Sequence, residues 1–433
     1  MNFNEAYEYV IKSYSAGKKR GYDLIRAALD LAGSPYKTLP VIQVAGTNGK
    51  GSVCSMLNSI LLSAGYSTGL FTSPHLIKFN ERFKVNGNDL TDDEMAKYAA
   101  QAKALSEAVL GAGEFFSFFE MFTICAFLCF ADKKVDLAIF EAGVGGRLDS
   151  TNIAENTVLS VITSISFDHT DLLGGTIREI TLEKAGIIKK NTKTVLYFQS
   201  EEVYNLIKGV CAEKGSELYY PSKLKIETRN ESLSGAEFDI TCEYFRYENV
   251  RLNFAGEYQL QNAATALLAV SALRASGYSV TESAVYAGMK AARWAGRMET
   301  LSENPLILLE GAHNLGGIYE LDRSINRYFA GKDVILVFAA LKGKDYRGMV
   351  SLITANANVK TVIFTTPAYR VKAADPNELA LSCEKTKEIF IIEGYKDALN
   401  KAVSLAKENG VIICCGSLYL VGDISESFSG GHK

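Results

Sequence analysis

The chain has 433 residues, of which 48% are hydrophobic and 22% are charged, so it has the composition of a globular protein. This composition excludes a disordered, collagen-like or low-complexity chain, and the length allows roughly three domains of about 150 residues or two larger ones. The 46 basic and 49 acidic side chains leave a formal net charge of −3. No global field therefore draws the chain to nucleic acid or to an anionic membrane, and we expect neither as a partner.

The cysteines and the amino terminus favour a cytoplasmic location. The eight cysteines lie mostly inside apolar runs such as Val411–Cys415, and none forms a Cys-x-x-Cys pair. We therefore expect reduced core residues rather than a disulfide framework or a zinc site. Residues 1–5 lack a basic segment followed by an apolar one, so no signal peptide is predicted. The most apolar stretch, Phe115–Ala131, is shorter than the roughly 20 residues of a membrane span and contains Glu120, which predicts a buried helix.

Short β-branched runs alternate with helical periodicity in the first part of the chain. They are Val41–Ala45, Val135–Phe140, Val158–Thr163 and Thr194–Phe198. Such alternation predicts a parallel sheet with crossover helices. Between Lys223 and Ala255 the pattern changes to polar and apolar alternation, which predicts a small antiparallel sheet attached to the first domain.

A second α/β series follows a helix that we expect from Gln259 to Ala275. Its strands are expected at Leu306–Leu309, Val334–Phe338, Thr361–Thr365, Ile389–Ile392 and Val411–Cys415. We place a domain boundary at residue 296, so that residues 1–296 form a first domain and residues 297–433 a second, Rossmann-like α/β domain. Ligands of open parallel sheets bind beyond the carboxyl ends of the strands, so a cleft between two such domains could hold one substrate on each side.

The segment Gly46–Ser52 follows the first strand directly and opens a helix with regularly spaced apolar residues. A strand, a glycine loop and a helix in this order are typical of a P-loop ATP-binding domain, in which Lys50 contacts phosphate and the Ser52 hydroxyl reaches Mg²⁺. The residues expected to contact the nucleotide are Asn48, Gly49, Lys50, Gly51 and Ser52. The match is imperfect, because Val44 stands where the usual pattern has Gly and Gly51 separates Lys50 from Ser52. A glycine-rich turn without nucleotide is the alternative.

Three further side chains are expected beside this loop. Glu141 follows the strand Val135–Phe140, where a carboxylate is a natural Mg²⁺ ligand, although a capping or salt-bridged Glu is the alternative. His169 arrives at the same edge of the sheet, but a lone His is more often a structural hydrogen-bonding residue. Lys184 could be a phosphate contact, a surface cation or, if desolvated and neutral, an amine able to react with CO₂. The residues alone do not choose among these roles.

Eight segments, taken in order, carry a resemblance to a known family. They are Gly46–Ser52, Thr72–Leu76, Phe79–Arg82, Glu141–Asn152, Asp168–Asp171, Glu183–Ile187, Gly311–Asn314 and Gly416–Leu420. Together they resemble the bacterial folylpolyglutamate synthases, which often also act as dihydrofolate synthases, within the Mur ligase superfamily. The resemblance covers the chain from about residue 15 to about residue 425.

This resemblance implies an ATP-dependent ligase of folate and one-carbon metabolism. A folate-type carboxylate would be phosphorylated to an acyl phosphate, which the amino group of L-glutamate would attack, releasing ADP and phosphate. The acceptor would be a reduced folate, with dihydropteroate as a further candidate, and we expect a monomer. Such chemistry mainly needs positioning and charge neutralisation, which agrees with the phosphate loop.

The resemblance also implies roles for individual residues. The family's metal ligands match Ser73, Glu141 and His169, with Ser52 near the Mg²⁺ of the nucleotide, and Lys184 matches a lysine that is carbamylated. The positions that contact ATP from the carboxy-terminal side match Asn262, Arg297 and Glu310. Two residues depart from the family pattern, since Glu310 stands where Asp is usual and Leu315 where Pro is usual. Glu310 keeps the charge on an arm that is longer by one methylene.

The pterin and aminobenzoate end of the folate is expected, by analogy, near two segments. Their residues are Ser117, Phe118, Phe119, Glu120, Leu148, Asp149 and Ser150. Aromatic faces suit stacking on a flat ring, although the phenylalanines could simply belong to the core.

Two other functions are compatible with parts of this pattern. A different Mur-superfamily amino-acid ligase usually carries an extra amino-terminal domain, and this chain reaches its phosphate loop by residue 46. A nucleotide-gated binding ATPase without ligase chemistry would need a basic, aromatic binding face, which the near-neutral charge does not favour.

Overall fold

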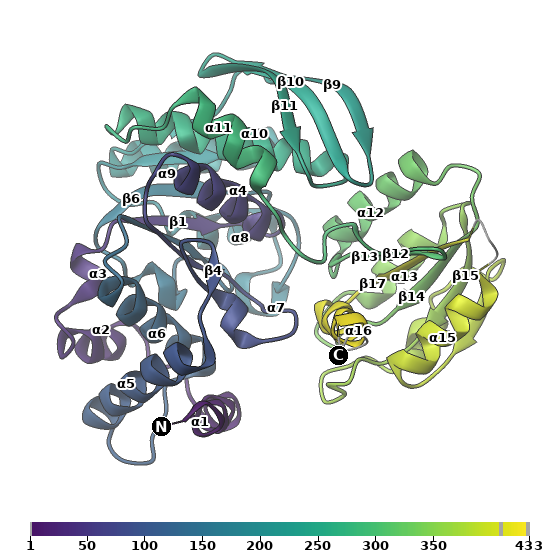
Figure 1. Ribbon diagram of the computed structural model, residues 1–433, viewed down its shortest axis with the longest axis horizontal. Coiled ribbons are helices and arrows are strands. Elements are labelled where there is room, and N and C mark those ends of the chain that lie inside the picture. The colour runs from purple at the N-terminus through teal and green to yellow at the C-terminus, as the bar shows by residue number, and fades with distance from the viewer. Residues whose placement is uncertain (1, 407–409, 430–433) are drawn as a thin grey trace.

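The computed structural model describes residues 2–406 and 410–429, and two sheets with helices on their faces organise these residues (Figure 1). The predicted α/β fold is confirmed, with a large, mostly parallel first sheet, a small antiparallel sheet and a second α/β sheet. The second sheet begins at Glu299, close to the predicted domain boundary at residue 296, which stays a prediction. Residues 1 and 430–433, at the ends of the two predicted domains, lie outside the described residues.

The first sheet has the strand order β4-β3-β2-β5-β1-β6-β7-β8. Strands β2 and β5 to β8 run parallel to β1 or to one another, whereas β3 and β4 add an antiparallel edge. The strands are β4 (Asn88–Asp89), β3 (Phe83–Val85), β2 (Thr68–Phe71), β5 (Leu137–Glu141), β1 (Val41–Ala45), β6 (Thr157–Ile162), β7 (Lys193–Leu196) and β8 (Glu217–Tyr219). Every residue of β1 is buried, as expected for a central parallel strand covered on both faces.

Helices cover both faces of the first sheet. One face packs on α4 (Lys50–Ser63), α10 (Glu257–Ala275) and α11 (Glu282–Ala291). The other faces α1 (Phe3–Ala16), α2 (Tyr22–Asp30), α3 (Pro35–Thr38), α5 (Asp92–Leu110) and α6 (Phe118–Asp132). The remaining elements near this sheet are η1 (Phe79–Arg82), η2 (Ser150–Ile153), α7 (Thr170–Leu173), α8 (Ile177–Ala185) and α9 (Glu201–Lys214). The predicted burial of the apolar stretch is confirmed, because α6 is buried from Glu120 to Phe130.

The predicted antiparallel sheet is confirmed and lies against α10 and α11 (Figure 1). It consists of β9 (Lys225–Ser232), β10 (Gly235–Cys242) and β11 (Phe245–Leu252). Alternate side chains of β10 and β11, such as Phe238 and Val250, are buried in the same core as α4. This core joins the small sheet to the first α/β unit, as the alternating pattern predicts.

The second sheet has the order β12-β13-β17-β14-β15-β16, with β12 antiparallel. Its strands are β12 (Glu299–Glu303), β13 (Leu306–Leu309), β17 (Val411–Cys415), β14 (Val334–Phe338), β15 (Val359–Phe364) and β16 (Glu388–Ile391). One face packs on α12 (Leu315–Tyr328), α13 (Tyr346–Thr354) and α14 (Pro376–Ala380), the other on α15 (Tyr395–Leu405) and α16 (Leu418–Ser429). The predicted strands of both sheets are found within two residues of their expected ends.

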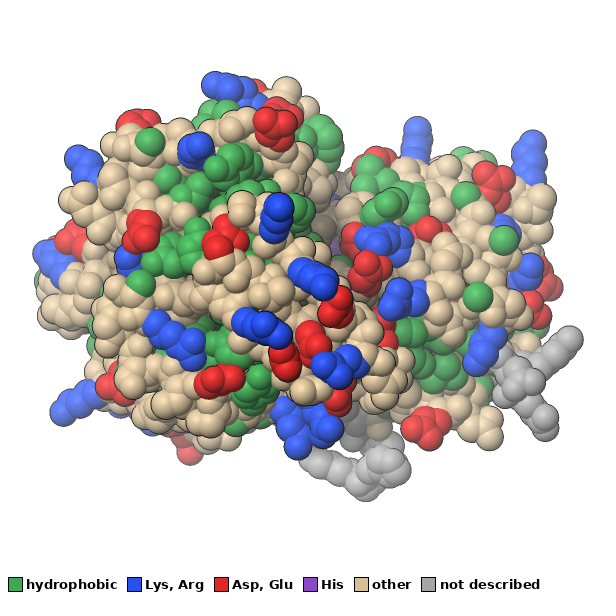
Figure 2. Space-filling model, turned by 90° about the horizontal axis from the view of Figure 1, so that it is seen from above, with side chains coloured by type: hydrophobic (Ala, Val, Ile, Leu, Met, Phe, Trp, Pro, Cys, Tyr) green, Lys and Arg blue, Asp and Glu red, His purple; other side chains and the backbone are tan. Residues whose placement is uncertain are grey.

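The remaining expectations from composition concern cysteines, charge and membranes. All eight cysteines are unpaired in the structure, and all but Cys242 are buried, as expected for core residues. On the face drawn in Figure 2, basic and acidic side chains are interspersed. Within residues 2–406 and 410–429, no helix is both long enough and apolar enough to cross a bilayer.

Helices α4 and α11 pack so closely that Gly288 of α11 touches Ile60 of α4. A Cβ atom at Gly288 would lie 2.4 Å from Ile60 Cα. We therefore expect Gly288→Ala to lower the free energy of unfolding by about 1–3 kcal/mol, measured by urea denaturation. Gly209 of α9 is the matched control, because nothing lies within 4 Å of its added Cβ. Gly209→Ala should raise stability by about 0.5–1 kcal/mol through helix propensity, and equal effects of the two substitutions would contradict the close packing.

Candidate active site

A cavity of about 490 Å³ is lined by residues from both α/β parts of the chain. It lies at the carboxyl ends of β1, β5 and β6, as expected for an open parallel sheet. Most of the residues predicted for the site line it: Asn48, Gly49, Lys50, Gly51, Ser73, Ser117, Phe118, Phe119, Glu120, Glu141, Leu148, Asp149, Ser150, His169, Lys184 and Arg297.

The phosphate loop joins β1 to α4 at the centre of the sheet. Gly49 has φ 83°, and a Cβ there would lie 2.3 Å from the side-chain oxygen of Asn262, so this position requires glycine. Lys50 begins α4 and donates its Nζ hydrogens to the carbonyl oxygens of Gly46 (3.2 Å) and Thr47 (3.1 Å). The lysine thus folds back on its own loop, beside the backbone N–H groups at the start of a helix, which is where an anion binds.

Glu141, the last residue of β5, is a buried carboxylate next to this loop. Its side chain is 3% exposed, and its Oε2 accepts a hydrogen bond from the backbone N–H of Ser73 (3.1 Å). Burial raises the pKa of Glu141, although the charge of Lys50 opposes this shift. A buried anion beside a phosphate loop is suited to a cation, because the cation would offset the desolvation of the carboxylate.

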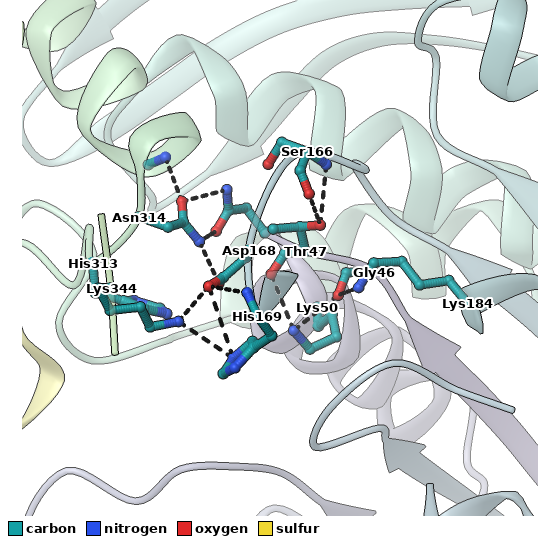
Figure 3. Close-up of polar contacts among 12 residues, drawn as sticks. Gly46, Thr47, Lys50, Ser166, Asp168, His169, Lys184, His313, Asn314 and Lys344 are labelled. Carbon is teal, nitrogen blue, oxygen red and sulfur yellow. Dashed lines mark hydrogen bonds and ion pairs between the residues drawn. The ribbon is translucent and has the colours of Figure 1, made fainter. Parts of the chain in front are cut away.

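Lys184 of α8 is a buried lysine that also contacts the phosphate loop. Its side chain is 3% exposed, and its Nζ donates to the carbonyl oxygen of Gly46 (2.7 Å), which Lys50 also contacts (Figure 3). Burial, together with the nearby charge of Lys50, lowers the pKa of Lys184 to about 7. Of the three roles that the residues left open, burial excludes a surface cation and favours an amine that is partly neutral at pH 7.

His169 lies at the start of α7 with a left-handed backbone, φ 51°. Burial lowers the pKa of His169, so its imidazole is neutral at pH 7 and has a lone pair for a ligand. Its Nε2 lies 3.3 Å from Nζ of Lys344, a residue of the second α/β part.

Three predicted residues do not line the cavity. Ser52 is buried within the first turn of α4. Asn262 supports the loop at Gly49 and donates to Gln259 Oε1 (2.9 Å). Glu310 accepts from the Met298 N–H (3.0 Å), and its Oε1 lies 3.7 Å from Arg297, so it braces that arginine.

Two carboxylates that were predicted to lie near the folate accept hydrogen bonds from backbone N–H groups of the protein. Glu120 accepts from the N–H of Ser117 (3.0 Å) at the start of α6 and, through its other oxygen, from the N–H groups of Arg20 (2.9 Å) and Gly21 (3.0 Å). Asp149 accepts from the N–H groups of Gly143, Val144 and Thr151. Both side chains shape the cavity wall by ordering backbone, while Leu148 is 50% exposed beside it.

The sequence reasoning missed a polar network that connects the two α/β parts (Figure 3). Asp168 forms an ion pair with Lys344 and accepts from Asn314 Nδ2 (2.9 Å). Asn314 also exchanges two amide hydrogen bonds with Asn48 of the phosphate loop (3.1 and 3.0 Å). Although burial acts to raise it, the charge of Lys344 holds the pKa of Asp168 well below its usual range. Asp168 and Asn314 lie in noted segments, but no sequence signal identified Lys344.

The protein alone does not supply a conventional metal cluster. In the part of the chain that the structure describes, no group of three His, Cys, Asp or Glu side chains could hold a metal ion. Glu141 and His169 would therefore have to be joined by hydroxyl, phosphate or modified-lysine oxygens.

Comparisons with known proteins agree with this geometry. The Mur ligase middle domain matches residues 44–270, and the Mur ligase glutamate ligase domain matches residues 296–418. The chain is 35% identical to the dihydrofolate synthase/folylpolyglutamate synthase of Bacillus subtilis (strain 168), over 98% of both chains. It is similar to the solved Mycobacterium tuberculosis folylpolyglutamate synthase complexed with ADP, with a TM-score of 0.90, 29% identity and 98% of each chain covered. It is also similar to an FPGS-AMPPCP-folate complex, with a TM-score of 0.86, 28% identity and 99% of each chain covered.

The lowered pKa of Lys184 predicts a specific pH dependence of stability. The folded chain releases this proton near pH 7, whereas the unfolded chain keeps it to about the ordinary value of 10.5, so unfolding takes up a proton between these values. Stability should therefore rise with pH in this window. The free energy of unfolding of the native chain minus that of Lys184→Met should become more positive by about 1 kcal/mol per pH unit from pH 7 to pH 9.

Urea denaturation in CO₂-free buffer measures this difference. Lys190→Met is the control, because Lys190 is an exposed lysine just after the same helix. A difference for Lys184→Met that stays constant with pH, as expected for Lys190→Met, would mean that Lys184 is protonated throughout.

Proposed function

The chain belongs to the Mur ligase family, and we propose that it is an ATP-dependent ligase that adds L-glutamate to a folate. The observation that carries this proposal is that the phosphate loop, Glu141 and Arg297 line one cavity between two α/β parts. A relative that matches nearly the whole chain bears the name dihydrofolate synthase/folylpolyglutamate synthase. The combination of a phosphate loop with a cavity between two α/β parts supports this proposal.

We propose the following roles for the residues of the phosphate loop. Lys50 leaves the carbonyl groups of Gly46 and Thr47 and binds the outer oxygens of ATP, while N–H groups of Asn48, Gly49, Gly51 and Ser52 surround the phosphates. The folate carboxylate then accepts the γ-phosphoryl group to give an acyl phosphate and ADP. The amino group of L-glutamate attacks the acyl carbon, and phosphate leaves as the amide forms. The protein contributes mainly positioning and charge neutralisation.

Five side chains are proposed to hold Mg²⁺: Ser52, Ser73, Glu141, His169 and, once carbamylated, Lys184. Mg²⁺ supplies neutralisation of phosphate charge during the transfer. The donors fit such an ion, because Glu141 is a buried carboxylate with a raised pKa and His169 is neutral. Lys184 fits carbamylation, because a buried amine with a pKa of about 7 has the free lone pair that reacts with CO₂. The carbamate would replace a cation by an anionic oxygen ligand.

The nucleotide is proposed to extend to the second α/β part. Asn262 supports the loop at Gly49, and Arg297 faces the cavity where it can neutralise phosphate charge. Glu310 carries a longer side chain than the Asp usual in the family, and it acts by holding Arg297 and the backbone of Met298. Its role is thus positioning rather than direct nucleotide contact.

The folate ring is proposed to bind at the other end of the cavity, against the phenylalanines that begin α6. The lining there consists of Ser117, Phe118, Phe119, Glu120, Leu148, Asp149 and Ser150. Phe118 and Phe119 are only partly buried, so they keep free surface for stacking on a flat ring.

We propose a monomer divided at residue 296, with dihydropteroate as a second acceptor beside reduced folates. A cytoplasmic location is favoured by the eight unpaired cysteines, since such thiols are typical of a reducing compartment.

Measurement of ADP release tests the proposed function. We expect release to require both L-glutamate and an acceptor, with tetrahydrofolate and dihydropteroate assayed separately. Lys50→Ala should abolish turnover, with a fall of about 1000-fold or more, because phosphate charge would be left unneutralised. Turnover that is independent of folate would indicate an ATPase without ligase activity, and a requirement for another acid would indicate a different Mur ligase.

Lys184→Ala tests the carbamate. We expect it to lose most activity and to recover part of it when a short carboxylic acid such as acetate is added, because the acid can occupy the space of the carbamate. Unchanged activity in Lys184→Ala would contradict this role. Lys190→Ala serves as the control for loss of a nearby lysine, because its side chain is exposed.

A further inference from the structure

Arg82, the last residue of η1, is a buried cation in the cavity wall that the proposed chemistry does not use. Its side chain is 6% exposed and lines the cavity. Its Nε donates to Nδ1 of His75 (2.9 Å), which fixes the plane of the guanidinium group. Among residues 2–406 and 410–429, no carboxylate lies within 4.0 Å of Arg82, and its two terminal nitrogens have no hydrogen-bond partner.

Burial of this arginine is costly, so its retention without a carboxylate in direct contact needs an explanation. Its guanidinium carbon lies 5.4 Å from the ring centre of Phe118 and 5.2 Å from that of Phe122, which gives cation–π stabilisation. Burial lowers the pKa of Arg82 to about 10, so it still carries its charge at pH 7. A desolvated guanidinium with free N–H groups facing a cavity is a binding site for a carboxylate.

The position of Arg82 decides which carboxylate that is. On one side, the charge of Glu141 acts on Arg82, and the backbone N–H of Thr72 donates to the Arg82 carbonyl next to Ser73 (3.0 Å). On the other side, Arg82 contacts Phe118, where the folate ring is proposed to bind. Arg82 thus lies between the phosphoryl-transfer end and the ring end of one cavity.

A folate has a second carboxylate at this point of its structure. The reacting γ-carboxylate is separated from the aminobenzoyl ring by a glutamyl residue, whose α-carboxylate branches off between them. Dihydropteroate lacks this group, since its reacting carboxylate is attached directly to the ring. We propose that Arg82 binds the α-carboxylate of the terminal glutamyl residue and thereby selects glutamylated acceptors. This inference rests on the proposed function and adds the group that distinguishes its acceptors.

Two acceptors that differ by one carboxylate test this proposal. Tetrahydrofolate carries the α-carboxylate, whereas tetrahydropteroyl-4-aminobutyrate lacks it and keeps the reacting carboxylate. We expect kcat/KM of the native chain to be at least about 10-fold higher with tetrahydrofolate, because a charged hydrogen bond is lost in the analogue. In Arg82→Met, which keeps the volume and the contact with the phenylalanine rings, this ratio should fall to near one, and Arg82→Lys should give an intermediate ratio. Arg26→Met is the control and should keep the native ratio, because Arg26 also lies over two aromatic rings but away from the cavity.

Each result supports or overturns the assignment. If Arg82→Met lowers kcat/KM equally with both acceptors, Arg82 acts on the reacting carboxylate, the phosphates or the incoming glutamate. This result would overturn its assignment to the α-carboxylate. If Arg82→Met does not fold, the ratio of kcat/KM for the two acceptors is compared between the native chain and Arg82→Lys. A ratio near one for the native chain is by itself a refutation. If the native chain turns over no pteroyl acceptor, the proposed function has failed. Calorimetric binding of the two acceptors to the native chain then tests Arg82 separately, and equal affinities would overturn its role.

Discussion

The parallel pairing of β5, β1 and β6 is the constraint on which the rest of the site depends. Because β1 lies between the other two, the phosphate loop, Glu141 and the segment that leads to His169 all emerge at one edge of the sheet. Val44 pairs with Glu141, so the buried carboxylate is fixed in register with a residue two positions before the loop. Backbone hydrogen bonds between these strands thereby place side chains that are far apart in the sequence in one cavity.

An excess of positive charge is the second organising feature of the cavity. Lys50, Lys184, Arg82 and Arg297 line it together with few free carboxylates, since Glu120 and Asp149 are engaged by backbone N–H groups. Desolvation by burial, together with the repulsion of Lys50, explains why the pKa of Lys184 falls to about 7. The protein alone holds this arrangement at a cost in stability, which bound anions would relieve. The same charges make the cavity suited to a triphosphate and a polyacidic acceptor at once.

Much of the fold and part of the site could be predicted from the sequence, and the remainder depends on tertiary contacts. Hydrophobic periodicity located four strands of the first sheet and five of the second, because buried parallel strands are apolar runs. It did not locate β2, β3, β4, β8 or β12, which are short or lie at sheet edges. Lys184 could be noted but not assigned, because its chemistry depends on burial, which a single sequence does not reveal. Glu310 and Glu120 were expected to contact ligands, which stays a prediction, and their hydrogen bonds to backbone N–H groups could not be foreseen because only the folded chain brings those groups near. Lys344 was missed because its partner, Asp168, lies in the other α/β part, and no local pattern marks such a pair.

The paired amides of Asn48 and Asn314 have a consequence for how the two α/β parts meet. Neutral hydrogen bonds of this kind exchange with water at a small net change in free energy, usually about 1 kcal/mol each. They can therefore align the nucleotide loop with the start of α12 without fastening the two halves permanently. The Asp168–Lys344 ion pair adds a charged contact beside these amides, so the nucleotide loop of one part and the start of α12 in the other meet in one relative orientation.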